Sequence, residues 1–226
     1  FTPAAGAAEV CARGGVVASA CPIASAIGAG ILERGGSAVD AAVAVGFALA
    51  VTYPQAGNIG GGGFMLVRGE SGETTFLDFR EKAPLAARRD MYLDERGEVI
   101  ENLSLLGALA AGVPGSVSGL HRAHELYGTL PWGELLAPAV ALARDGFPVS
   151  ARLAASLERL QAHIERYPGL RRFTRSDGSP LAPGDTLVQP ELAGTLEIIA
   201  REGPRGFYEG PIADLIVAGT RGGGGI

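Results

Sequence analysis

Four consecutive glycines, Gly60 to Gly63, constrain the fold of this chain more than any other feature. They lie between an apolar run of mostly small residues and the segment FMLVR, whose composition favours a strand. Glycine loses more conformational freedom on folding than any other residue, so a run of four needs a structural reason. We expect either a sharp bend of the backbone at this turn or the close approach of another group.

The order of elements around these glycines argues against a phosphate-binding loop. The Walker pattern needs Lys and then Ser or Thr directly after the loop, whereas Phe64 follows here. The predicted helix precedes the glycines, so they face the negative end of its dipole, which repels anions. The dinucleotide pattern fails because it needs a strand before the glycines and a helix after them. What remains is a turn that avoids side-chain clashes, or one that leaves room for a second backbone or a substrate.

The region before the glycines predicts a strand followed by two helices. Residues 14–20 (GGVVASA) form a short β-branched segment typical of a strand, and Pro22 begins a helix that ends at Gly35. Ser37 caps the next helix, and Asp40, three residues on, can reach back to the cap. The many alanines of this second helix allow close packing all round, so we expect it to be central.

A β-hairpin is predicted after the glycines, with strands FMLVRG and TTFLDFR on either side of the turn ESG. Side chains alternate between the two faces of a strand. The faces of the second strand therefore hold alternate residues, with Phe76, Asp78 and Arg80 on one and Thr75, Leu77 and Phe79 on the other. Asp78 and Arg80, which carry opposite charges, therefore share one face of this strand.

The second half of the chain is predicted to be mostly helical. Five segments open near Pro or Ser and mostly end on Gly, at residues 114–128, 131–146, 150–169, 190–203 and 210–219. Residues 176–185 form a loop rich in turn formers. Strands followed by a long helical region indicate a sheet with covering helices, hence an α/β or α+β sandwich.

Composition excludes several classes of protein. With 226 residues and 47% hydrophobic content the chain can build one large domain or two small ones. A net charge of -5 and a pI near 5.3 argue against a nucleic-acid partner. The most apolar run, residues 41–53, is shorter than the roughly 18 residues of a membrane span and indicates a buried helix. The chain starts at Phe1 without a signal peptide and ends in TRGGGGI, and we expect both ends to be cut.

The residues that most readily suggest metal or thiol chemistry are expected to be structural. Cys11 and Cys21 are too few for a disulfide framework and lack the spacing of a zinc site, although one bridge would fit an exported protein. His121 and His124 lie three apart on a predicted helix, but no third ligand stands at a convincing spacing. We expect Trp132 to serve packing.

Five blocks of the sequence together resemble the large subunit of γ-glutamyltransferase (γ-glutamyltranspeptidase, glutathione hydrolase). In the family's own order they are GGSAVDAAVAVGFALAVTYPQAGNIGGGGFMLVR, DFREKAP, AAGVPGSVSG, GDTLVQPELAGTLEIIA and GPRGFYEGPIAD. The resemblance runs from about Gly14 to the last residue. It implies an α+β fold, the four-layer αββα sandwich of the N-terminal-nucleophile hydrolases, made as a zymogen that cleaves itself autocatalytically into two subunits.

The resemblance also implies what this chain lacks. The catalytic nucleophile of the family is the Thr at the new N-terminus of the small subunit, so no catalytic residue is assigned to residues 1–226. These residues are expected to be part of a single N-terminal-nucleophile hydrolase domain, a large-subunit portion truncated at its C-terminus. The small subunit from the same precursor is the expected protein partner, and a periplasmic or secreted location is expected.

One substrate contact carries over from the family, the arginine of its D-x-R-E motif, which is Arg80 in LDFREKAP. In relatives it binds the α-carboxylate of the γ-glutamyl group. The planar fork of an arginine suits a carboxylate and stays charged at any working pH. Without the motif, pairing with Asp78 or with Glu81 is the commoner role for such a side chain.

The implied activity is γ-glutamyl transfer and hydrolysis, with glutathione and related γ-glutamyl amides as donors, and amino acids, peptides or water as acceptors. Thr would attack the γ-amide carbonyl, form a γ-glutamyl-enzyme, and be released by water or an amine. No metal or organic cofactor is required. Two alternatives stay open: a cephalosporin or glutaryl acylase of the same fold, and an inactive homologue that acts as a binding protein.

Overall fold

The computed structural model describes residues 11–226; the segment before them, with the expected cut end at Phe1, lies outside the described residues. The helices, in chain order, are α1 (Pro22–Glu33), α2 (Ala38–Thr52), α3 (Ser116–Tyr127), α4 (Trp132–Asp145), α5 (Ala151–Glu158), α6 (Pro190–Glu202), α7 (Arg205–Tyr208) and α8 (Gly210–Gly222). The strands are β1 (Phe64–Arg68), β2 (Thr74–Asp78), β3 (Phe147–Pro148) and β4 (Thr186–Leu187). Short 3-10 turns are η1 (Ala108–Ala110), η2 (Gln161–His163) and η3 (Pro168–Phe173).

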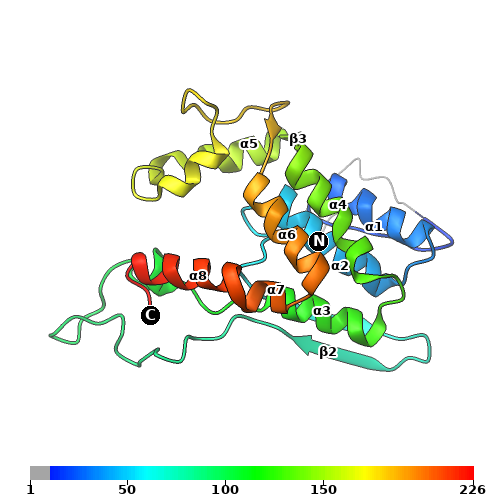
Figure 1. Ribbon diagram of the computed structural model, residues 1–226, viewed down its shortest axis with the longest axis horizontal. Coiled ribbons are helices and arrows are strands. Elements are labelled where there is room, and N and C mark those ends of the chain that lie inside the picture. The colour runs from blue at the N-terminus through cyan, green and yellow to red at the C-terminus, as the bar shows by residue number, and fades with distance from the viewer. Residues whose placement is uncertain (1–10) are drawn as a thin grey trace, which may run out of the picture.

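Helix α2 is central, as its composition predicts. Most of its residues are buried, and it packs against α1, α3 and α4, while α4 packs in turn against α6 (Figure 1). The predicted capping box is present: the Asp40 N–H donates to Ser37 Oγ at 3.0 Å, and the Ser37 N–H donates to Asp40 Oδ2 at 2.8 Å. Sequence therefore determines both the start of the central helix and its burial.

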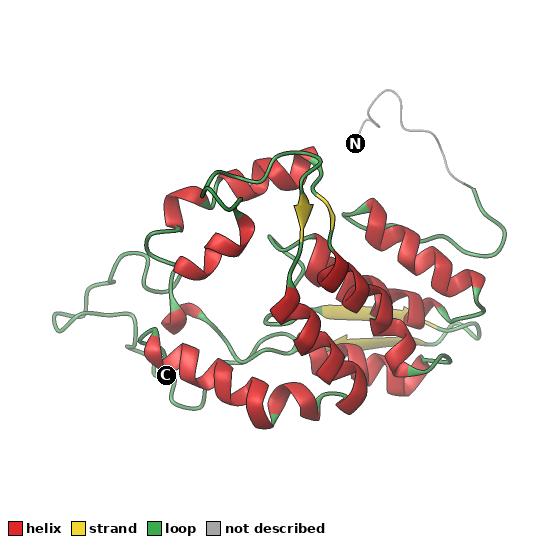
Figure 2. Ribbon diagram, turned by 45° about the horizontal axis from the view of Figure 1, so that its top comes forward, coloured by secondary structure: helices red, strands yellow, loops and turns green. Residues whose placement is uncertain are grey.

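The predicted hairpin is also present, with β1 and β2 antiparallel and Phe64 opposite Asp78. It lies along one side of the helical body, next to α3 (Figures 1 and 2). One face packs its half-buried residues on the core, and the other carries three exposed apolar side chains, Phe64, Leu66 and Phe76. The hairpin thus has helices packed on one face and an exposed apolar face on the other. This arrangement corresponds to one helical layer and part of one sheet of a sandwich.

The strand predicted over residues 14–20 is wrong. These residues run without regular structure, because no strand in the described part of the chain pairs with them. Val16 is exposed, and Val17 packs beside Gly28 of α1 and Val45 of α2. The β-branched pattern here serves packing against helices, since a strand needs a hydrogen-bonded partner.

The single helix predicted over residues 150–169 is only half correct. Helix α5 begins after the Ser150 cap, whose hydroxyl accepts from the Leu153 N–H at 3.1 Å, and it ends at Glu158. Buried residues of α5 stop at Leu157, and the following segment forms the short turns η2 and η3 without a buried residue. A helix owes most of its stability to a buried apolar face, which this segment lacks.

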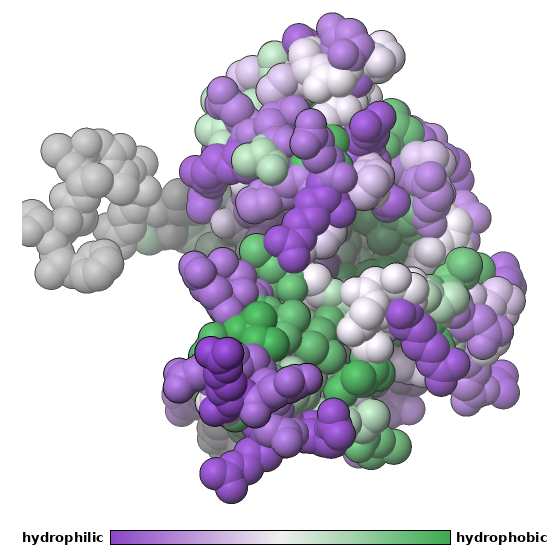
Figure 3. Space-filling model, turned by 90° about the vertical axis from the view of Figure 1, so that its left-hand side faces the viewer, coloured by the Kyte–Doolittle hydropathy of each residue, from purple (hydrophilic) through white to green (hydrophobic). Residues whose placement is uncertain are grey.

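The end of the molecule formed by α8 and residues 83–114 carries exposed apolar surface. Helix α8, which has no buried residue, and the irregular segment 83–114 reach out from the helical body (Figure 1). On this face apolar residues gather around a hollow, with hydrophilic residues above and below them (Figure 3). A largely apolar pocket of about 290 Å³ lies here, lined by residues that include Val113, Ile216 and Val217. The described residues thus form an α+β fold with a mostly helical second half.

Candidate functional site

Within the four glycines, Gly62 marks a close approach of two backbones, whereas a Cβ on Gly60 would meet nothing within 4 Å. None of Gly60 to Gly63, all of which are described, has a positive φ, so left-handed conformation is not their purpose. A Cβ placed on Gly62 would lie 2.5 Å from the Glu81 nitrogen and 2.6 Å from the Phe79 oxygen. The turn after α2 is therefore pressed against residues 79–82, which we name the Arg80 segment.

The Arg80 segment is held by main-chain contacts along its length. The Phe79 N–H donates to the Gly63 carbonyl at 3.0 Å and extends the hairpin by one pair, while Lys82 and Val113 form an isolated antiparallel bridge with N–O distances of 3.2 and 2.7 Å. Because Phe79 and Lys82 are both hydrogen-bonded and Gly62 lies close to the main chain between them, the backbone at Arg80 is held at both ends.

Helix α3 begins against the same turn. The N–H groups of Gly115 and Ser116 both donate to the Gly61 carbonyl, at 2.7 and 2.9 Å. A Cβ on Gly115 would collide with the Phe79 carbonyl oxygen. These bonds satisfy two of the free N–H groups at the helix start and fix α3 relative to the Arg80 segment.

Four further hydrogen bonds link the hairpin to α3, and α3 with its following loop to the central helix. The Tyr127 hydroxyl at the end of α3 donates to Thr75 Oγ1 on β2 at 2.6 Å. Buried Asp40 accepts from the Thr129 N–H at 3.0 Å and from its hydroxyl at 2.6 Å. Ser37 also donates its hydroxyl to the Tyr127 carbonyl at 3.0 Å. The elements around Arg80 are thereby linked at both ends of α3.

Burial tends to raise the pKa of Asp40, but the hydrogen bonds donated by Thr129 and Ser37 outweigh it and lower that pKa below its ordinary value. The carboxylate is therefore charged at neutral pH, and its charge strengthens the bonds that join α2 to the loop after α3.

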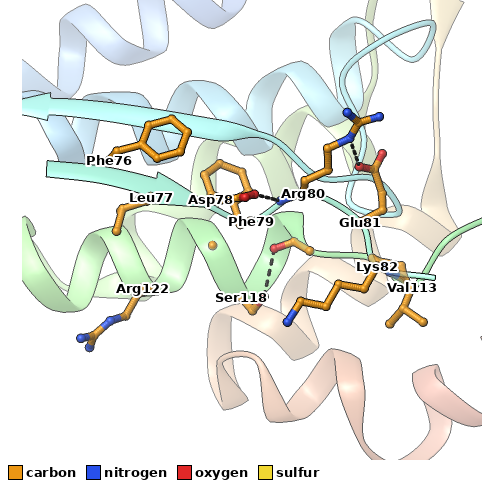
Figure 4. A pocket seen from close by; sticks show the side chains of 13 residues that line it. Phe76, Leu77, Asp78, Phe79, Arg80, Glu81, Lys82, Val113, Ser118 and Arg122 are labelled. Carbon is orange, nitrogen blue, oxygen red and sulfur yellow. Dashed lines mark hydrogen bonds and ion pairs between the residues drawn. The ribbon is translucent and has the colours of Figure 1, made fainter. Parts of the chain in front are cut away.

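The guanidinium of Arg80 is free to meet a ligand. Its side chain is 69% exposed, and Arg80 is one of the residues that line a groove of about 710 Å³ at the end of β2 and beside α3 (Figure 4). Its Nε lies 3.4 Å from Glu81 Oε2, and the two side chains project to the side opposite Lys82. Asp78 contacts Arg80 through the backbone, accepting from its N–H at 3.0 Å.

The alternative role for Arg80, a structural ion pair with Asp78 or Glu81, has little support in the structure. The Glu81 contact joins neighbouring residues that are both exposed, and such pairs contribute little to stability. A rigid main chain carrying an exposed guanidinium is what a carboxylate-binding site needs. Arg80 thus has an exposed guanidinium on a constrained main chain, and its role in binding stays a prediction.

The sequence does not single out the other polar residues of the groove. Lys82, Ser118 and Arg122 line it together with Arg80, and Arg122 Nη1 contacts Glu125 Oε2 at 3.1 Å. Ser118 and Arg122 belong to α3, far along the chain from the motif. No period or motif links the two segments, so the sequence alone held no signal for their proximity.

His121 and His124 pack on one aromatic ring. Their centroids lie 4.9 and 5.4 Å from that of Trp132, whose indole N–H donates to the Ile199 carbonyl at 3.0 Å. His124 Nε2 lies 2.8 Å from the Leu130 carbonyl oxygen, and a carbonyl can only accept, so this nitrogen is the donor. The expected packing role of Trp132 is confirmed.

Residues 11–226 contain no group of three or more His, Cys, Asp or Glu side chains arranged to hold a metal ion. Within the same range, no helix has the length and apolar character that crossing a bilayer requires.

Residues 24–226 match the family model of gamma-glutamyltranspeptidase. The chain belongs to this family. It is 49% identical over 216 residues to the glutathione hydrolase proenzyme of Escherichia coli, which aligns with 95% of this chain. The crystal structure of Helicobacter pylori γ-glutamyltranspeptidase superposes with a TM-score of 0.94 at 44% identity, over 97% of this chain and 63% of that one. The predicted family is confirmed.

A wider likeness reaches the acylases. Cephalosporin acylase from Bacillus halodurans superposes with a TM-score of 0.80 at 26% identity, over 100% of this chain and 44% of that one. The predicted fold class, that of the γ-glutamyltranspeptidases and related N-terminal-nucleophile hydrolases, is confirmed by these structures. The chain spans only 37% of the length of the Escherichia coli protein.

Proposed function

We propose that this chain is a large-subunit portion of an enzyme that transfers and hydrolyses γ-glutamyl groups, with Arg80 binding the α-carboxylate of the donor. The observation that carries the proposal is the Arg80 segment. It has a main chain held on both sides and an exposed guanidinium, within the family's D-x-R-E motif. Glutathione and related γ-glutamyl amides are the proposed donors, and water or an amino acid or peptide amine is the acceptor.

The rest of the precursor would supply the nucleophile. A Thr hydroxyl, its proton taken by its own α-amine, attacks the γ-amide carbonyl, and the amine leaves with a proton. Water or a second amine then attacks the resulting ester and releases the Thr. The role of Arg80 is to hold the glutamyl end so that the carbonyl lies within reach of the Thr. The small subunit, carrying this Thr, is the proposed partner.

The acylase alternative has a specific observation in its favour, the shared fold with cephalosporin acylase. A glutaryl group keeps the distal carboxylate of a γ-glutamyl group and lacks only its α-amino group. Arg80 could therefore serve either substrate. The higher identity to glutathione hydrolase and γ-glutamyltranspeptidase favours the γ-glutamyl reading.

The test uses the full-length precursor with γ-glutamyl-p-nitroanilide and glutaryl-p-nitroanilide as paired substrates. We expect turnover of the first only, and self-cleavage into two polypeptides. Arg80→Ala should raise KM on the order of a hundredfold, because a charge-assisted, bidentate contact is lost, while self-cleavage continues. Arg80→Lys should lie between, because it keeps the charge and loses the fork.

Arg68, an exposed arginine at the far end of the same hairpin, provides the control. Arg68→Ala should leave KM and kcat unchanged. An unchanged KM in Arg80→Ala would remove Arg80 from the site, and preference for the glutaryl substrate would establish the acylase reading. A precursor that stays intact and inactive on both substrates would favour a binding protein.

A further inference from the structure

The ring of Phe79 packs closely against Gly63 of the turn before the hairpin and against Gly119 of α3. A Cβ placed on Gly119, near the start of α3, would collide with the Phe79 side chain, and one on Gly63 would lie 2.9 Å from its Cε2. Glycine inside a helix is unfavourable by about 1 kcal/mol relative to alanine. Gly119 is therefore explained by the ring beside it.

The position of the Arg80 guanidinium depends on this ring. Because the Arg80 side chain is 69% exposed and touches only the flexible Glu81 among the contacts described, its own packing does not place it. Arg80 follows Phe79 directly in the chain, and the two side chains point to opposite faces of this extended segment. A shift of the Phe79 ring would move the base of the arginine.

We infer that Phe79 is a positioning residue, which sets the place of the Arg80 guanidinium through its fit between Gly63 and Gly119. The inference rests on the proposed function, in which Arg80 binds the donor carboxylate. A misplacement of about 1 Å can cost a binding group most of its effect. Phe79 lines the same groove as Arg80, and its proposed effect acts through the position of the guanidinium, so we expect the change to fall on KM and to leave kcat nearly unaltered.

The test is a set of double variants in the full-length, self-cleaved enzyme. Phe79→Leu should raise KM for γ-glutamyl-p-nitroanilide on the order of tenfold. In the Arg80→Ala background the same change should add nothing, because no guanidinium remains to be misplaced. A structural role alone would lower activity by the same factor in both backgrounds, and that additive outcome would overturn the inference.

Gly63→Ala gives a second approach that leaves Phe79 in place. The three atoms nearest to its new methyl group would be Cε2, Cζ and Cδ2 of the Phe79 ring, and Leu lacks the first two. Gly63→Ala alone should therefore raise KM, whereas in the Phe79→Leu background it should raise KM little further. An equal rise in both backgrounds would contradict the fit between ring and glycine.

Phe147→Leu serves as the matched control, since Phe147 is a buried ring on β3, in the other pair of strands (Figure 1). It should lower Tm without changing KM. The proposed function and the positioning role of Phe79 can be refuted separately. If Arg80→Ala leaves KM unchanged, the proposed function falls. If Arg80→Ala raises KM and Phe79→Leu does not, only the positioning role falls.

Discussion

The Asp78 carboxylate accepts a hydrogen bond from the backbone N–H of Arg80, with 3.0 Å between Oδ1 and the nitrogen. The bond closes a turn where β2 ends, so the chain leaves the hairpin at the residue that carries the guanidinium. The acidic residue of the D-x-R-E motif thus shapes the backbone, while the arginine remains available.

Asp78→Ala should raise KM for the γ-glutamyl donor about fivefold to tenfold, as expected for the loss of one charge-assisted hydrogen bond. Asp78→Asn keeps an acceptor oxygen in the same place and should stay near the wild-type KM. Steady-state kinetics on the full-length, self-cleaved enzyme measures both. Equal rises in the two variants would mean that the charge of Asp78, and not its acceptor oxygen, matters.

Asp40→Ala should lower the free energy of unfolding by about 3 kcal/mol, because it leaves the N–H groups of Ser37 and Thr129 without their buried acceptor. The pKa of Asp40 is lower in the folded state than its ordinary value of 3.8. Its contribution is therefore present above about pH 4 and is lost as the pH falls through the folded-state value.

Urea unfolding of the full-length protein between pH 3 and pH 7 measures this contribution, with the exposed Asp214→Asn as the control. The difference between wild type and Asp40→Ala should shrink below about pH 4. A difference that stays constant over the whole range would mean that the charge of Asp40 contributes nothing.

His121 should make the protein less stable in mild acid. Burial lowers its pKa below the ordinary 6.5, Glu125 raises it, and nearby His124 lowers it further, with a net decrease. The unfolded chain therefore binds the proton more readily. The contribution of neutral His121 is complete above about pH 6.5 and is lost as the pH falls from there through the folded-state pKa.

Replacing His121 by Gln should flatten the dependence of Tm on pH between about 5 and 7. The exposed His163→Gln is the matched control and should leave the slope as in the wild type. Calorimetric measurement of Tm across this pH range tests the prediction. An unchanged slope of Tm against pH in His121→Gln would assign the acid sensitivity to other groups.

The parts of the fold that sequence predicts are those with a local cause. The Ser37 cap, the burial of α2 and the alternation that exposes Arg80 while half-burying Phe79 all follow from residues a few positions apart. A close approach at the glycine run was one of the two expectations, and Gly62 makes it, although the sequence did not identify what approaches. That partner is the Arg80 segment, brought back by the hairpin.

What sequence could not predict depends on distant partners. Residues 14–20 carry strand-like residues and form no strand, since pairing needs a neighbour that the described chain does not offer. The contact of Phe79 with Gly119 joins β2 to a helix that begins far along the chain. Neither glycine nor phenylalanine reveals such a contact by its type alone.

The bond from Gly115 to the Gly61 carbonyl also sets an order of events during synthesis. The hairpin can close as soon as Asp78 has left the ribosome, because its contacts are local. The main chain at Arg80 gains its second set of contacts only after α3 has emerged, and closing that long loop costs entropy before any contact repays it. We therefore expect the main chain at Arg80 to reach its final place late in folding, after the strand that precedes it has formed.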